Sequence, residues 1–278
     1  MKRFKNVGGG GNLELALQGF QGIENFCKKC NNSDMKHHCK NAKGFTLAEV
    51  LITLGIIGVV AAMTLPSLIN QYRVKQLRTA FMRSSSIIQN AMNQTASEFG
   101  YGNFKELNNI CGTLPESQTS SCLNSNKQLF EDINSDLLSR FNKLKEMKQF
   151  TLNQQRIKVY NFSGMSNILY GELYGVGGYG ILDKEGLYYL PDGTVISSLF
   201  FFYHGKYDGL TMTFDTNGPS RGPNRYGYDI FIYNTGTWYK LCTKKQDGGD
   251  YNGRGCYDYA IKDVNPDDNT KGYWDSLY

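Results

Sequence analysis

The feature that most constrains this chain is an apolar run of 25 residues, Phe45–Ile69, which contains a single charged residue, Glu49. As an α-helix this run would extend about 37 Å, which exceeds the roughly 30 Å hydrocarbon layer of a membrane. The apolar region of a secretory signal peptide is shorter and lies nearer the N-terminus. The sequence therefore predicts one transmembrane helix, and no other stretch of it is as long and apolar.

The net positive charge of the chain lies before this run. Residues 1–44 hold 8 Lys or Arg and 3 Asp or Glu, whereas residues 45–278 hold 22 of each sign. The formal net charge of +5 therefore belongs to the first 44 residues alone. Because the remainder offers no net charge with which to attract a polyanion, we exclude nucleic acid as a partner.

Four of the 7 cysteines follow the run, at Cys111, Cys122, Cys242 and Cys256. Their even number and close spacing predict two disulfides, Cys111–Cys122 and Cys242–Cys256, each of which stabilises the fold by about 3 kcal/mol. Disulfides need an oxidising compartment, which places the chain after the run outside the cytosol. The cations that flank the run are nearly equal in number on its two sides, so the positive-inside rule does not decide the orientation. The alternative for these cysteines is four buried free thiols.

Glu49 is a candidate functional residue because of its position in the run. A carboxylate inside an apolar span costs up to about 3 kcal/mol on insertion into a membrane. It therefore needs either hydration at the level of the lipid headgroups or a positive partner at the same depth. The run itself contains no Lys, Arg or His that would serve as this partner.

The residues Lys43-Gly44-Phe45-Thr46-Leu47-Ala48-Glu49 resemble the processing motif of type IV pilins and type II secretion pseudopilins. The resemblance implies that a prepilin peptidase cleaves the Gly44–Phe45 bond and methylates Phe45. It implies that Glu49 pairs with the Phe45 ammonium of a neighbouring subunit, and Pro66 stands where pilin helices commonly carry a distorting proline. It further implies a single-pass protein of the inner membrane whose partners are other pilin or pseudopilin subunits of a filament.

A leader of 44 residues is longer than is usual in this family. It contains candidate zinc ligands at Cys27, Cys30, His37, His38 and Cys39. The other interpretations are an unstructured leader and a start at Met35, which would leave a ten-residue leader ending at Gly44.

Beyond Pro66, apolar residues recur in steps of three and four as far as Glu98, which predicts an amphipathic helix. Gly100 and Gly102 then end it. Phe45–Glu98 would thus form one near-continuous helix. Its first half is apolar on all sides, and its second half is apolar on one side.

The chain after residue 100 divides into a helical part and a strand-rich part. We expect a polar loop at Asn103–Ser125 and an amphipathic helix at Gln128–Met147. After about residue 150, aromatic, β-branched and glycine residues dominate, and Asp192-Gly193 is typical of a hairpin. Strands are expected at Arg156–Phe162, Gly186–Leu190, Thr194–Tyr203, Gly209–Asp215 and Tyr228–Asn234. The predicted fold class is α+β, with the long helix packed on an antiparallel sheet in a pilin-like head.

Two motifs in the strand-rich part have plain structural interpretations. Gly175–Gly180 has the spacing G-x-G-x-x-G, but the residues after it read as strand and turn. A phosphate cradle needs a helix N-terminus at that point, so we interpret the segment as a glycine-rich loop. The acidic segment Asp263–Asp268 is expected to be a solvated loop.

A third motif is a candidate cation site. Asp215-Thr216-Asn217-Gly218 and the later Asp229 carry carboxylate and amide oxygens on glycine-rich loops. Such oxygens suit calcium, with Asp215, Asn217 and Asp229 as ligands. The segment also resembles a stretch in some pseudopilin-like proteins, and major pseudopilins are a calcium-binding family. The alternative is a turn whose Asp and Asn side chains bond to the backbone.

Catalysis finds no support in the sequence, because the only histidine after the leader, His204, has no nucleophile near it in the chain. We interpret the protein as a structural subunit rather than an enzyme. The expected parts are a leader, a transmembrane and assembly helix, its amphipathic continuation and an extracytoplasmic head, at 1–44, 45–69, 70–100 and 101–278. The alternative is a permanently membrane-anchored extracytoplasmic binding protein, although a plain anchor has no use for Glu49.

Overall fold

The fold is that of a computed structural model of the 278-residue chain. It describes residues 45–108, 110–111, 121–122, 125–141, 145–148, 156–165, 168–170, 186–202, 209–234, 241–245 and 249–278. The expected leader with Gly44 and its zinc ligands, and the glycine-rich segment 175–180, lie outside the described residues. The chain divides into two compact units at Thr64 and Leu65, and each is described by itself.

The long helix predicted from the sequence is α2, Leu47–Glu98, with 52 residues. Its C-terminal end is closed by two backbone bonds that reach back into the last turn. The Tyr101 N–H donates to the Ala96 carbonyl at 2.8 Å, and the Gly100 N–H donates to the Ser97 carbonyl at 3.1 Å. Gly100 has a φ of 78°, the left-handed conformation that this helix ending requires and that glycine adopts without strain.

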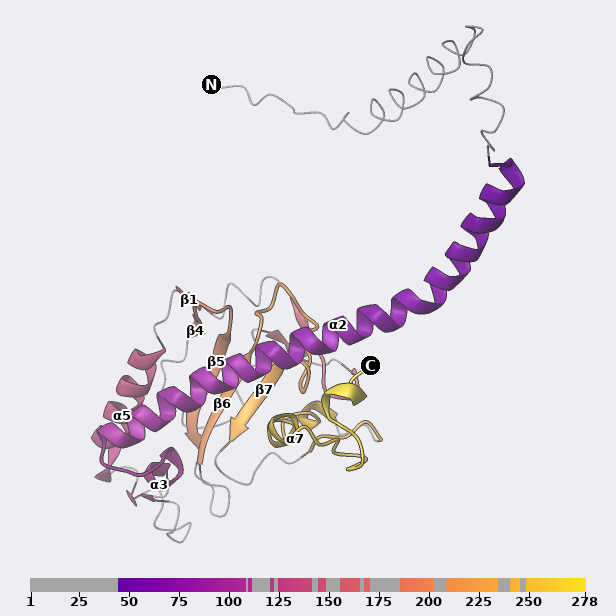
Figure 1. The fold of residues 1–278 in the computed structure, drawn as a ribbon. Coiled ribbons are helices and arrows are strands. Elements are labelled where there is room, and N and C mark those ends of the chain that lie inside the picture. Colours follow the sequence, from indigo (N-terminus) through magenta and orange to yellow (C-terminus); the bar gives the residue numbers. More distant parts are fainter. Residues whose placement is uncertain are drawn as a thin grey trace, which may run out of the picture. The chain divides into compact units, whose positions relative to one another are not determined.

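In the second unit, α2 covers one face of the sheet (Figure 1). The buried positions are spaced by three and four residues, at Leu77, Phe81, Ser84, Ser85, Ile88, Ala91, Met92, Thr95 and Ala96. The Phe81 ring lies at the centre of this contact, 4.4 Å from the Phe231 ring and 5.3 Å from the Trp274 ring, measured between centroids. This apolar stripe is the one that the sequence predicted for the second half of the helix.

The main sheet has five antiparallel strands in the order β1-β4-β5-β6-β7. Their bounds are Lys145–Lys148, Gly186–Tyr189, Val195–Phe202, Gly209–Asp215 and Ile230–Asn234. The hairpin expected at Asp192-Gly193 joins β4 to β5, with Tyr189 opposite Val195. A smaller antiparallel pair is formed by β2 and β3, Lys158–Val159 and Ile168–Leu169. The α+β class with an antiparallel sheet is therefore confirmed.

The helix expected at Gln128–Met147 is too long in that prediction. The structure has α5 at Lys127–Arg140, and Lys145–Lys148 is instead strand β1. This tetrapeptide favours a helix by composition, but it pairs along its whole length with β4, and that pairing satisfies its backbone groups.

The loop expected at Asn103–Ser125 contains a short helix, α3, Phe104–Asn108. The Glu106 N–H donates to Asn103 Oδ1 at 3.0 Å, and Glu106 Oε2 accepts the Gly102 N–H at 3.0 Å. The two side chains thus satisfy free backbone groups at the start of the helix, which explains why a polar sequence forms a helix here.

The C-terminal part holds η6, α7 and η7, at Gly249–Tyr251, Tyr257–Lys262 and Trp274–Ser276. The expectation of a solvated loop at Asp263–Asp268 is wrong. Asp263 forms an ion pair with Arg78 of α2 at 2.9 Å, and Asp267 accepts the Lys244 N–H at 2.6 Å. These carboxylates hold the C-terminal segment in place rather than facing water alone.

Candidate functional site

The first candidate site is the apolar part of α2 in the first unit. Its side chains are exposed, and Phe45 and Leu47 retain 88% and 80% of their accessible surface. It belongs to the one helix in the described part of the chain that is long and apolar enough to cross a membrane. An apolar surface of this extent is stable only in contact with lipid or with other apolar helices.

The polar groups inside this apolar part are satisfied locally. The Thr53 hydroxyl donates to the Val50 carbonyl at 2.9 Å, and the Thr64 hydroxyl donates to the Val60 carbonyl at 3.0 Å. Pro66 lies inside α2 and has no N–H to donate to the carbonyl one turn earlier, so it interrupts the helical hydrogen-bond ladder.

Helix α2 begins with a capping box formed by Thr46 and Glu49. Glu49 Oε2 accepts the Thr46 N–H at 2.8 Å and the Thr46 hydroxyl at 2.9 Å, and the Glu49 N–H lies 3.2 Å from Thr46 Oγ1. The pattern is the one in which a threonine before a helix and a glutamate three residues later satisfy each other's backbone donors. Sequence reasoning identified Glu49 but missed this local role, although the Thr-x-x-Glu spacing is visible in the sequence.

The capping box leaves Glu49 with capacity for a second partner. Both bonds from Thr46 go to Oε2, and no donor to Oε1 is found among the described residues. The Thr46 N–H belongs to the Phe45–Thr46 peptide bond, so cleavage before Phe45 would leave the capping box intact. The local cap and an ionic partner for Glu49 are therefore compatible.

The second candidate site is the pair of buried carboxylates expected to bind a cation. Asp215 ends β6 and is 1% exposed, and Asp229 precedes β7 and is fully buried. Asp215 Oδ1 accepts the N–H groups of Asn217 and Gly218 at 3.0 and 2.9 Å, and its Oδ2 accepts the Tyr170 hydroxyl at 2.7 Å. The carboxylate thus holds the turn that follows β6.

Asp229 holds the next turn in the same way. Its Oδ2 and Oδ1 accept the N–H groups of Asn224 and Arg225, each at 2.8 Å. Burial, followed by the charge of Asp215, raises the pKa of Asp229 well above its usual value. Burial also raises the pKa of Asp215, although the N–H groups of Asn217 and Gly218 oppose the shift.

The loops around these carboxylates hold oxygens that have no donor. Thr216 Oγ1, Asn217 Oδ1 and Asn224 Oδ1 are buried without a hydrogen-bond partner. Neutral and charged oxygens in one loop cluster are the ligands that calcium takes, so the donor chemistry fits. Against this, all four carboxylate oxygens of Asp215 and Asp229 already accept hydrogen bonds. The described residues contain no group of three or more His, Cys, Asp and Glu side chains that would hold a metal ion.

The four cysteines after the apolar run form two disulfides in the structure, Cys111–Cys122 and Cys242–Cys256. These are the pairs that the sequence predicted. Their Cα–Cα distances are 5.8 and 5.0 Å, within the range that a disulfide spans without backbone movement.

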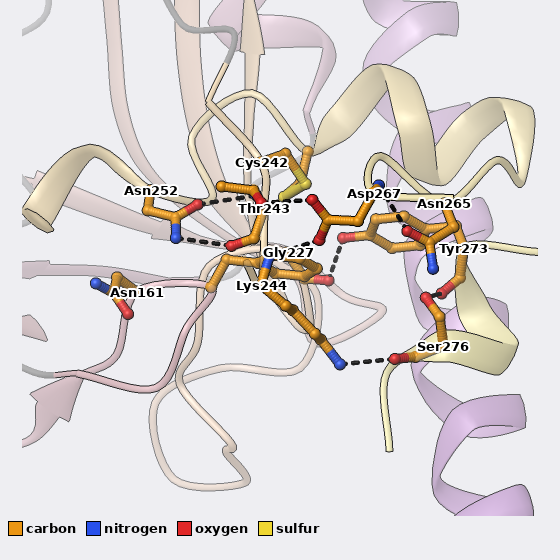
Figure 2. The surroundings of a disulfide bond; sticks show 12 residues. Asn161, Gly227, Cys242, Thr243, Lys244, Asn252, Asn265, Asp267, Tyr273 and Ser276 are labelled. Atoms are coloured by element: carbon orange, nitrogen blue, oxygen red, sulfur yellow. Dashed lines mark hydrogen bonds between the residues drawn. A yellow bond between two sulfur atoms is a disulfide. The ribbon is translucent and has the colours of Figure 1, made fainter. Parts of the chain in front are cut away.

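The residues next to Cys242 fasten the C-terminal segment (Figure 2). Lys244 Nζ donates to the Ser276 carbonyl at 2.6 Å, and the Thr243 hydroxyl bonds to Asp267. Asn252 bridges the Thr243 backbone, accepting its N–H at 3.1 Å and donating to its carbonyl at 2.8 Å. The 242–256 disulfide therefore closes a loop whose polar groups hold the last residues of the chain.

Comparison with known proteins identifies the N-terminal part of the chain. Residues 39–65 match the family described as the prokaryotic N-terminal methylation motif, the signature of type IV pilins and pseudopilins. The match spans the Gly44–Phe45 bond, Glu49 and most of the exposed apolar part of α2. No curated protein and no solved structure matches the chain significantly. The chain therefore carries the pilin-type signature on a long helix that is followed by an antiparallel sheet.

Proposed function

We propose that this protein is a structural subunit of a type IV pilus or a type II secretion pseudopilus. The observation that carries the proposal is the methylation motif at residues 39–65, which runs directly into a helix with exposed apolar side chains. A soluble protein does not expose such a surface, whereas a subunit that moves from a membrane into a bundle of helices needs it in both places.

In this proposal the protein is first anchored in the inner membrane with its head outside the cytosol. Prepilin peptidase then removes residues 1–44 and methylates Phe45. The two disulfides of the head support this orientation, because they need an oxidising compartment. The role is structural, and the partners are other pilin-type subunits.

Glu49 has a specific task in the assembled filament. Cleavage creates an ammonium group at Phe45, and Glu49 of one subunit pairs with this group on the next. The capping box supports the proposal by fixing the Glu49 side chain at the helix terminus while Oε1 stays free of donors in the described chain. In a bundle of apolar helices, a carboxylate and an ammonium gain from pairing only in the register that brings them together.

Replacement of the glycine at the cleaved bond tests the processing step. We expect Gly44→Leu to accumulate as the full-length chain when prepilin peptidase is coexpressed, because the bulky side chain blocks the peptidase. Gly22→Leu makes the same change within residues 1–44 and should be processed like the wild type. Normal shortening of the Gly44→Leu protein on a denaturing gel would overturn the assignment of the bond.

We also propose that calcium binds at Asp215, Asn217 and Asp229. The buried oxygens of Thr216 and Asn217 that lack a donor support this proposal, because a cation would satisfy them. A bound ion also offsets the repulsion between the two carboxylates, and it stabilises the folded chain by about 2.7 kcal/mol at 100 times its dissociation constant.

Thermal unfolding of the full-length protein in detergent tests the calcium proposal. We expect calcium to raise the melting temperature relative to a chelator, and Asn217→Ala to reduce this rise. Magnesium, which demands a more regular geometry, is the control ion. An unchanged melting temperature in calcium and in chelator would show that the two aspartates serve only the turns.

A further inference from the structure

A groove in the second unit lies between α2 and the loop that follows β6. It has a volume of about 790 Å³, and α2 contributes Tyr72, Arg73 and Lys75 to its lining. The loop contributes Arg221 and Pro223, and Tyr278 lines it as well. The groove therefore combines cations with aromatic side chains.

The cations of this groove differ from their neighbours along the chain. Arg78 and Arg83 of α2 form ion pairs with Asp263 and Asp192, at 2.9 and 3.0 Å. In contrast, none of the carboxylates in the described chain forms an ion pair with the three groove cations, which are Arg73, Lys75 and Arg221. Asp275 lines an adjoining groove that shares Lys75 with this one, but it forms no ion pair with Lys75. The groove thus presents three uncompensated positive charges.

The groove begins where the apolar part of α2 ends. Leu68 and Ile69 are exposed apolar residues, and Arg73 follows Ile69 by four residues. At 1.5 Å per residue, Arg73 and Lys75 lie about 6 and 9 Å further along the helix axis. The polar headgroup region extends about 5–8 Å beyond the hydrocarbon layer on each side, so these cations reach the depth of lipid phosphates.

The aromatic residues of the groove suit the same depth. Tyr72 and Tyr278 are exposed. Tyrosine is enriched at the surface of membranes, where its ring contacts the acyl chains and its hydroxyl faces the headgroups. Cations beside a membrane span attract anionic lipids, and Arg221 adds a contact from a separate loop, so the headgroup is held between two elements.

We propose that this groove binds the phosphate headgroup of an anionic phospholipid in the leaflet that faces the head. The proposal rests on the proposed function in one respect, since it takes the apolar part of α2 as a membrane anchor. Headgroup binding holds the subunit at a defined depth and in contact with anionic lipid before assembly. Entry into a filament then requires the lipid to leave the groove.

Short-chain lipids test the proposal with the full-length protein in neutral detergent. Dihexanoyl phosphatidylglycerol and dihexanoyl phosphatidylcholine have equal tails and differ in headgroup charge, and native mass spectrometry measures their binding. We expect phosphatidylglycerol to bind more tightly, by about fivefold for each groove cation that contacts it. Equal binding of the two lipids by the wild type would overturn the proposal.

Matched charge variants locate the binding. In Arg73→Gln/Lys75→Gln/Arg221→Gln the preference for phosphatidylglycerol should disappear. The control removes three exposed lysines elsewhere on the second unit, Lys105→Gln/Lys158→Gln/Lys262→Gln, and should keep the preference. An equal loss in both triple variants would show a general charge effect and overturn the groove as the site.

Two further measurements separate the alternatives. If an acidic segment of a second copy occupies the groove, the groove variant would keep the lipid preference and lose cross-links between subunits, which would overturn the lipid proposal. Alkaline extraction of membranes tests the anchor independently. A wild-type protein released by alkali would contradict the proposed function, whereas the lipid preference in detergent is measured without any membrane anchoring.

Discussion

Before Thr64, helix α2 exposes its apolar side chains, whereas from Leu77 to Ala96 it buries one face in the second unit. The two stretches have the same secondary structure, and their difference lies in where the partner of the apolar surface comes from. The later stretch finds its partner in its own chain, at Phe214, Phe231 and Trp274. The earlier stretch must find it in lipid or in other subunits. The comparison teaches that changes in the first stretch should affect assembly and changes in the second should affect folding.

The largest expected effect is loss of assembly in a Glu49 variant. Glu49→Gln keeps a side chain that accepts the Thr46 N–H in a capping box, but it removes the charge that pairs with the Phe45 ammonium. We expect filament yield to fall at least about tenfold while the protein still enters membranes, because a neutral residue inserts at lower cost.

Thr46→Val provides the matched control for Glu49, since it removes the capping hydroxyl and keeps the charge. It should lower filament yield far less than Glu49→Gln. Electron microscopy of sheared filaments measures both. If Thr46→Val abolished assembly and Glu49→Gln did not, the role of Glu49 would be the helix cap and not the ion pair.

The next largest effect is on the stability of the second unit. Phe81→Ala removes the ring at the centre of the contact between α2 and the sheet and should lower the free energy of unfolding by about 3–5 kcal/mol. Ile57→Ala, in the exposed stretch, should leave that free energy unchanged. Denaturant unfolding in detergent measures both variants, and equal losses would contradict the division of α2 into two functions.

Removal of a disulfide should have a slightly smaller effect. Cys242→Ser/Cys256→Ser opens a loop of 14 residues and should cost about 3 kcal/mol, with loosening of the C-terminal segment that Lys244 holds. Cys111→Ser/Cys122→Ser opens a loop of 11 residues elsewhere and should leave that segment protected from proteolysis. Four alkylatable thiols after the apolar run in the native wild-type protein would refute both disulfides.

The smallest effect is the pH dependence of stability that Asp229 confers. Its pKa is raised in the folded state, so the folded chain binds more protons than the unfolded chain as pH falls through this pKa. Its contribution to stability is therefore fully present below the unfolded pKa, near 4, and is lost as pH rises through the folded pKa. In chelator, the melting temperature should rise on mild acidification, and Asp229→Asn should reduce this rise. A slope that the substitution leaves unchanged would assign the effect to other groups.

The long helix and the sheet were predictable because their signals are local. The apolar run, the spacing of buried positions from Leu77 onward and the glycine at Gly100 all act within a few residues. The hairpin at Asp192-Gly193 is equally local. Strand β1 was not predictable, because Lys145–Lys148 takes its conformation from pairing with β4 and not from its own composition.

The sites show the same limit. The methylation motif is contiguous, and the sequence alone identified Gly44, Phe45 and Glu49. The capping boxes of Thr46 and Asn103 were also visible as spacings, but the first was hidden in an apolar run and the second in a segment taken as a loop. The hydroxyl that Tyr170 donates to Asp215 joins residues far apart in the chain, and such contacts follow only from the fold. The three groove cations come from two elements for the same reason.

The most direct test of the central claim is the intact mass of the protein purified from membranes of cells that contain an active prepilin peptidase. A pilin-type subunit should begin at Phe45, lack residues 1–44 and carry one additional methyl group on its N-terminus. Two disulfides should lower the mass by four hydrogens relative to the reduced chain. A protein that retains Met1 or Met35 under these conditions would contradict the assignment.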